Sequence, residues 1–185
     1  ATTATNAQGL TGTPDITVRN IVGTAATFTG VLTYEDVTNV DSVGIITTRG
    51  GAHFNGGASL REKINIVANK VSAAPNINLD DGMVHYFTTT EDAQSTPNIR
   101  SSVGLNTAMA VGDTSSVTII TTAAAAGYAT TINIDGAVTG AVKWVGGSAP
   151  SAGGSGGLDI YSYQIIKTAN STFTVIGNLT NAASA

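Results

Sequence analysis

Short runs in which apolar and polar residues alternate fill most of the chain, and glycine, proline or Asp/Asn pairs close them. The clearest two runs, residues 159–168 and 171–176, place Ile, Tyr, Phe and Val at alternating positions on either side of Ala169-Asn170. This period of two predicts a pair of neighbouring β-strands. They follow a loop rich in Gly, Ser, Ala and Pro that begins at Trp144, the only tryptophan. This closing third of the chain carries the strongest prediction of a compact domain.

Further strands are predicted upstream of this pair, at residues 77–79, 83–88, 99–103, 116–122, 128–134 and 141–145. The first two of these are separated by Asp80-Asp81-Gly82, an acidic turn that predicts a β-hairpin. The run Ala123–Ala126 has helical propensity, but its place between β runs and before Gly127 predicts a turn or a bulged strand end. About eight strands at roughly ten-residue spacing predict a β-sandwich, jelly-roll-like knob.

The first part of the chain has a different pattern. Residues 1–20 are rich in Ala and Thr and predict an extended arm. Residues 21–70 contain strand-like phrases that bury too little to stand alone, so stacked or intertwined chains would have to cover them. Ser59–Ala68 fits either a capped helix or a strand, and we favour the strand. We therefore expect an arm at 1–20, a short shaft-like β segment at 21–70 and a β-sandwich knob at 71–185.

Composition supports the all-β prediction. Ile and Val occur 16 times each and Thr 29 times, against only 7 Leu, and β-branched residues suit a pleated sheet better than a helix. Charged residues make up 11% of the chain, well below the usual share of about 25%. Such a chain would have difficulty covering its surface as a monomer. The low charge therefore favours an assembly in which much of each chain faces another chain.

Charge and composition also exclude several classes of protein. The net charge is −4 and the eight Lys and Arg residues are scattered, which argues against a nucleic-acid partner. The chain has no cysteine and hence no disulfide or thiolate metal site. No apolar run approaches the length of about 20 residues that a membrane helix needs, so we expect no membrane insertion. The first residues show no signal-peptide pattern. Because the sequence begins at Ala1, we expect either the removal of an initiator Met or a chain cut from a longer protein.

The titratable residues predict no catalytic, cofactor or metal site. His53 and His85 have no nearby partner at metal-ligand spacing, so we expect structural or surface roles. The alternative for His53 is a metal or anion site on the three-fold axis of a trimer. Asp80-Asp81 lacks the alternating oxygens of a calcium loop, and a turn is a better interpretation than a glycosidase carboxylate pair. The glycine-rich stretch 153–157 lacks a Gly-Lys-Ser/Thr ending and precedes a β run, which indicates a connecting loop.

Trp144, Tyr161 and Tyr163 are the candidate contact residues. The two tyrosines are two positions apart and therefore lie on one face of their strand. Such a face can stack on the rings of a glycan, or it can pack in a core or a subunit interface. We favour packing for the tyrosines. Trp144, with the loop from 144 to 158, stays a candidate contact for a glycan or a partner.

Two segments carry a resemblance to a known group. Residues 32–51 (LTYEDVTNVDSVGIITTRGG) and the neighbouring phrase at 26–30 (ATFTG) resemble a phrase in the shafts of virion structural proteins of marine bacteriophages, especially those of cyanobacteria. The closing segment, WVGGSAP at 144–150 with DIY at 159–161, IIKT at 165–168 and FTV at 173–175, resembles the C-terminal domain of such proteins. The phrases YFT at 86–88 and PNIR at 97–100 do so as well. The chain is similar to tail-fibre-like proteins, but it carries only one copy of the shaft-like phrase.

This resemblance implies a virion location, reached after assembly in the host cytoplasm, and a non-enzymatic role without a cofactor. We expect a short tail fibre, spike or fibre tip, a homotrimer that binds other virion proteins through its N-terminal arm and displays its knob to a host surface glycan. The alternative is a capsid decoration, cement or capsid-fibre protein. A depolymerase would need a cleft with paired carboxylates, and the sequence indicates none.

Overall fold

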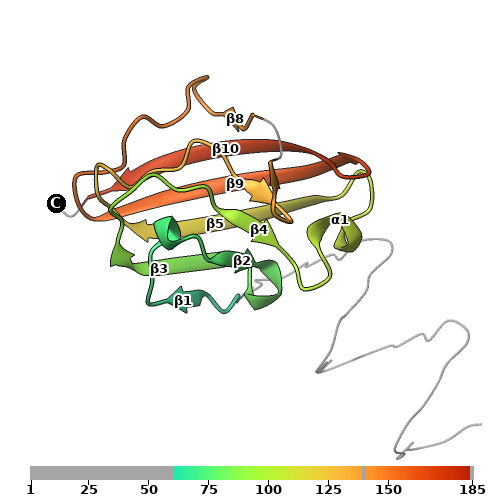
Figure 1. Cartoon of the computed structure of the whole chain (residues 1–185), viewed down its shortest axis with the longest axis horizontal. Coiled ribbons are helices and arrows are strands. Elements are labelled where there is room, and N and C mark those ends of the chain that lie inside the picture. Colours follow the sequence, from blue (N-terminus) through green and yellow to red (C-terminus); the bar gives the residue numbers. More distant parts are fainter. Residues whose placement is uncertain (1–60, 139–140, 184–185) are drawn as a thin grey trace, which may run out of the picture. The chain divides into compact units, whose positions relative to one another are not determined.

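The computed structural model describes residues 61–138 and 141–183, and this part of the chain consists mostly of β-strands (Figure 1). The prediction of an all-β chain is thereby confirmed. The predicted arm, the shaft-like segment as far as residue 60, and His53 all lie outside the described residues. The described residues fall within one compact unit, Gly56–Ala185.

Two sheets make up this unit. The large sheet has six strands in the order β1 (Asn65–Val67), β3 (Val84–Thr90), β5 (Thr114–Thr122), β9 (Leu158–Ala169), β10 (Thr172–Ala182) and β8 (Lys143–Trp144). The small sheet has four, in the order β2 (Asn76–Asn78), β4 (Asn98–Arg100), β6 (Asn133–Ile134) and β7 (Ala137–Val138). Three short helices lie in the connections: η1 (Val71–Ala73), η2 (Leu79–Asp81) and α1 (Leu105–Ala108).

From β1 to β6 the chain passes alternately through a strand of the large sheet and a strand of the small sheet. We call each two consecutive strands of this kind a rung: β1 with β2, β3 with β4, and β5 with β6. Strands of successive rungs pair in parallel within both sheets. Each rung therefore rests on its neighbour as in a solenoid, where single repeats bury too little to be stable alone. β1, which belongs to the predicted shaft-like segment, lies at one edge of the large sheet as far as the described residues show it, and β8 lies at the other.

The hairpin predicted across Asp80-Asp81-Gly82 is wrong. The strands on either side of this turn belong to different sheets, since β2 pairs with β4 and β3 pairs with β1 and β5. Ile77 before the turn and Phe87 after it are both fully buried in the same interior. The turn therefore carries the chain from one sheet to the other. Alternation indicates which residues share a face of a strand, but it does not indicate the strand's partner.

The strand pair predicted at the end of the chain is confirmed as the antiparallel hairpin of β9 and β10. Its turn is Asn170-Ser171, where Ser171 has a left-handed φ of 53°. Both strands run further than expected, and β10 continues to Ala182. The predicted strand at 116–122 is confirmed within β5, and residues 123–126 form a turn instead of a helix. In Figure 1 these long strands lie side by side across the large sheet.

One core lies between the two sheets. The small sheet contributes Ile77, Ile99 and Ile134, which are in register from rung to rung and almost completely buried. The large sheet contributes the buried face of β3, β5, β9 and β10, including Phe87 and Ile119. The two sheets therefore share one hydrophobic core. The parallel pairing of the rungs differs from the antiparallel pairing typical of a jelly roll.

Candidate functional site

Tyr161 and Tyr163 lie in the core. Their exposed fractions are 3% and 2%, and the two rings stack with centroids 6.2 Å apart and an interplanar angle of 7°. The Tyr161 hydroxyl accepts a hydrogen bond of 3.2 Å from the Ala129 N–H. Burial raises the pKa of Tyr161 to about 12 and that of Tyr163 well above its ordinary value. Both tyrosines therefore pack the interior, and neither ring presents a surface for a sugar.

Trp144 is half-buried, and part of its indole ring packs against the core. It meets Tyr163 edge-on, with centroids 6.0 Å apart and an angle of 65°. Its Nε1–H donates to the Thr130 carbonyl at 3.1 Å. A Cβ at Gly177 would lie 3.1 Å from the ring atoms Cε3 and Cζ3 of Trp144, so the glycine leaves room for the indole. These contacts hold the half-buried ring at the β8 edge of the large sheet.

A groove of about 190 Å³ lies beside this ring, between the loop after β8 and the end of β10. We call it the Trp-side groove, and its lining residues are Trp144, Val145, Ser148, Pro150, Ala152, Asn178, Leu179 and Asn181. The lining combines an indole, aliphatic groups, two amides and a hydroxyl, and it contains no charged side chain. Amides and hydroxyls beside an aromatic ring are suited to a neutral, hydroxyl-rich ligand.

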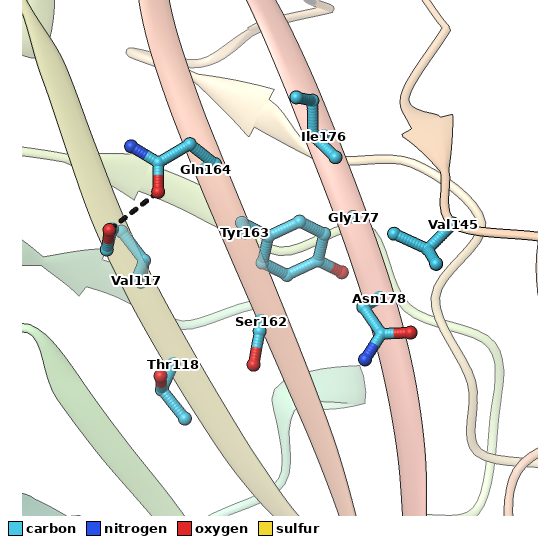
Figure 2. A pocket seen from close by; sticks show the side chains of 10 residues that line it. Val117, Thr118, Val145, Ser162, Tyr163, Gln164, Ile176, Gly177 and Asn178 are labelled. Atoms are coloured by element: carbon cyan, nitrogen blue, oxygen red, sulfur yellow. Dashed lines mark hydrogen bonds between the residues drawn. The ribbon is translucent and has the colours of Figure 1, made fainter.

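A second concavity, the sheet-face hollow, lies on the outward side of β5, β9 and β10. It measures about 310 Å³, and Figure 2 shows Thr118, Ser162, Gln164 and Asn178 around it. The Ser116 hydroxyl donates to Gln164 Oε1 at 2.7 Å. Val145 and Asn178 line both concavities. The Trp-side groove and the sheet-face hollow are therefore neighbours, and both are neutral.

The glycine-rich loop is a closely packed connection. A Cβ at Gly153 would lie only 2.4 Å from the Ala124 carbonyl oxygen. The Gly154 N–H donates to the carboxylate of Asp159 at 2.9 Å, and Asn181 Nδ2 donates to the same carboxylate at 2.6 Å. Asp159 is completely buried. The chain's own carboxylate thus takes the N–H that a phosphate loop would offer to a ligand.

Two further buried charged residues also hold loops, and the sequence analysis missed them. Lys167 is 6% exposed, and its ammonium group donates to the carbonyls of Asn106 and Met109, where α1 ends. Glu91 is 3% exposed and accepts from the N–H groups of Val71 and Ser72 at the start of η1. The sequence does contain a signal for the burial of Lys167 and Asp159. Both stand an even number of positions from the buried tyrosines of β9, and residues two apart share a face of a strand, so both lie on its inward face.

His85 has a structural role, one of the two roles expected for it. Its Nε2 lies 2.9 Å from the Gly82 carbonyl oxygen and its Nδ1 lies 3.2 Å from Asn65 Nδ2. Both contacts are satisfied by a neutral ring with the proton on Nε2. Desolvation lowers the pKa of His85, although the negative charges of Asp81 and Glu62 act to raise it. Across residues 61–138 and 141–183, no group of three His, Cys, Asp or Glu side chains could hold a metal ion.

Within the part of the chain that the structure describes, no helix is long and apolar enough to span a bilayer. No protein-family model, curated protein or solved structure shows significant similarity to this chain. The Trp-side groove and the sheet-face hollow are therefore argued from their geometry and chemistry.

Proposed function

We propose that this chain is a non-enzymatic structural protein of a bacteriophage virion, a short tail fibre, spike or fibre tip that displays a β knob for host attachment. The observation that carries this proposal is the Trp-side groove. The loop that forms one side of it contains residues 144–150, the segment in which the chain resembles tail-fibre-like proteins. The segment that carries the resemblance thus also forms the candidate contact surface.

The arrangement of the strands supports a display role. The chain enters the described unit next to β1, at one edge of the large sheet, and Trp144 lies in β8 at the opposite edge. Six strands at about 4.8 Å separate these edges by roughly 24 Å. In the proposed virion, residues 1–20 bind another particle protein, and the groove is the surface offered to the host. Host surface glycan is the ligand class we propose for the groove, because its lining is neutral, amide-bearing and aromatic.

Rigidity suits the same role. The indole is held by the Thr130 carbonyl and by Tyr163, and the carboxylate of Asp159 links the glycine-rich loop to Asn181 at the rim of the groove. A preformed groove loses less conformational entropy when a weak ligand such as a sugar binds. Repetition of the groove in the proposed homotrimer would raise the avidity for a cell surface.

The location and the groove can be tested separately. Labelled antibody against the chain, imaged on intact particles, should mark the tail in the proposed role. Label on the capsid, with binding of the purified chain to empty capsids, would favour the alternative of a decoration or cement protein. Shortening of host polysaccharide on incubation with the chain would overturn the non-enzymatic assignment.

Substitution of serine in the loop tests the groove itself. Ser148 lines the groove, whereas the equally exposed Ser151 does not. A Ser148→Arg side chain should fill the groove and lower binding to host cells at least tenfold, while Ser151→Arg should bind like the unmodified chain. Equal binding by both variants, with unchanged circular dichroism, would rule out the groove as the attachment site.

A further inference from the structure

The outward face of the large sheet has an unusual composition. Its outward positions from β1 to β10 are Ile66, Val84, Tyr86, Thr88, Thr114, Ser116, Thr118, Ile120, Thr122, Leu158, Ile160, Ser162, Gln164, Ile166, Thr168, Thr174, Ile176, Asn178, Thr180 and Ala182. None of these side chains is charged. The first charged residue met on this side is Lys143, in β8 at the sheet's edge. Solvent-facing sheet surfaces normally carry charged residues that oppose association.

An apolar row crosses this neutral face. Ile66, Tyr86, Ile120 and Ile160 are direct neighbours in register on β1, β3, β5 and β9. Ile66 is 65% exposed. The row is thus continuous over four strands and ends in a large aliphatic side chain that is open to solvent. A contiguous apolar strip within a neutral surface marks an association surface more strongly than scattered single residues do.

The face is also large enough for a stable contact. Five strands, each about 4.8 Å wide, cover about 24 Å, and the nine residues of β5 are about 30 Å long. The resulting area of about 700 Å² is close to the roughly 800 Å² that each partner contributes to a standard interface. The sheet-face hollow near Ser162 adds a concavity that a protruding side chain can fill.

We infer that the neighbouring copies of this chain in a homotrimer cover this face. Copies related by symmetry bring the same side chains near one another, so any charge would meet its like, and a charge-free face avoids that repulsion. A nucleic acid or an acidic partner would instead need a charged complement, which the face lacks. The inference rests on the homotrimer of the proposed function and identifies the surface that would face the neighbouring copies.

Lysine substitutions in the full chain test the face. Ser162 is exposed at the centre of the face, beside the sheet-face hollow, and Ile66 is exposed at its β1 edge. Sedimentation velocity should show an oligomer for the unmodified chain and at least a tenfold weaker association for Ser162→Lys and for Ile66→Lys. Val103→Lys is the matched control, because Val103 has nearly the same exposure, 64%, and lies in the connection between β4 and α1, away from this face.

The outcomes separate the inference from the proposed function. A monomeric unmodified chain would overturn self-association through any surface. An oligomer that withstands both lysine variants, each folded by circular dichroism, would overturn this face alone. Equal weakening by Val103→Lys would show a general effect of charge and would also overturn it. The virion role would be decided independently, by the label on intact particles.

Discussion

Gly177 shows how the absence of one side chain shapes the candidate site. It lies on the inward side of β10, directly paired with Tyr163 on one side and with Trp144 on the other. A Cβ at this position would lie 2.8 Å from Val142 Cγ1 and 3.1 Å from two atoms of the indole. The position of Trp144 beside its groove therefore depends on a glycine in the neighbouring strand β10.

Gly177→Ala should lower the free energy of unfolding by about 1–3 kcal/mol, because the added methyl group overpacks this contact. Urea denaturation followed by the fluorescence of Trp144 measures the change. Gly156→Ala is the control, since no atom lies within 4 Å of the Cβ position there. Equal stability of the two variants would contradict the proposed packing of the indole.

His85 makes the stability of the unit depend on pH. Desolvation lowers its pKa in the folded chain, so below a pH of about 6.5 the unfolded chain binds more protons than the folded one. The contribution of His85 is therefore complete above that pH and is lost as the pH falls. We expect the free energy of unfolding to decrease between pH 7.5 and 5.5, and His85→Gln to reduce this decrease. A free energy that rises on acidification over this interval would contradict the prediction.

Among the elements, the rungs are held together by polar side chains as well as by the core. Asp135 in the third rung accepts from the N–H groups of Leu105 and Asn106 at the start of α1. Glu91 links the second rung to η1 of the first rung in the same way. These carboxylates satisfy N–H groups at the starts of short helices, which otherwise have no partner within the helix. A chain with few charges thus uses several of them to connect successive rungs.

Asn98 joins all three rungs. Its Nδ2 donates to Asn76 Oδ1 in the first rung at 2.7 Å, and its Oδ1 accepts from the Gly136 N–H after the third rung at 2.8 Å. Asn98→Ala loses both hydrogen bonds and should cost about 1–3 kcal/mol of unfolding free energy. Asn76→Ala loses only one of them and should cost less. Chemical denaturation that ranks the two variants in the opposite order would contradict this role.

For the whole unit, strand order predicts where the structure opens. β5 and β9 pair with long neighbours on one or both sides and lie in the middle of the large sheet, whereas β1 and β8 are short edge strands. Local opening follows the number of hydrogen bonds and buried contacts that must break. Hydrogen exchange should therefore be slowest in β5 and β9 and fastest in β1 and β8. Faster exchange in β9 than in β8 would be inconsistent with this strand order.

The pairing of the strands explains which predictions succeeded. The alternation in 116–122, 159–168 and 171–176 was long enough to locate strands, and the short break predicted at Ala169-Asn170 lies one residue from the observed Asn170-Ser171 turn. The hairpin at 77–88 failed because partners were assigned by closeness in sequence, while parallel pairing joins strands through long connections. Asn-Ile recurs at 20–21, 65–66, 76–77, 98–99 and 133–134, so the dipeptide alone does not mark the rungs. The last three of these pairs are stacked in register, which only the pairing shows.

The candidate site was foreseen only in part. Trp144 ends β8 directly before the exposed loop, but its neighbours Asn178 and Asn181 come from β10, more than thirty residues later. Tyr161 and Tyr163 share a face, as their spacing requires, and that face is the buried one. The sequence shows that two residues lie on the same side of a strand, but not which side the second sheet will cover.

The amino-acid sequence is enough to predict the all-β class and the hairpin of the last two strands, and it shows that the chain carries little charge. These properties follow from local propensity and composition, which need no knowledge of distant contacts. The three-dimensional structure is needed to show that the strands from β1 to β6 stack as rungs, that both tyrosines are interior, and that the uncharged positions gather on one sheet face. Those properties depend on which distant strands pair and which face is covered, and a period of two is compatible with either face.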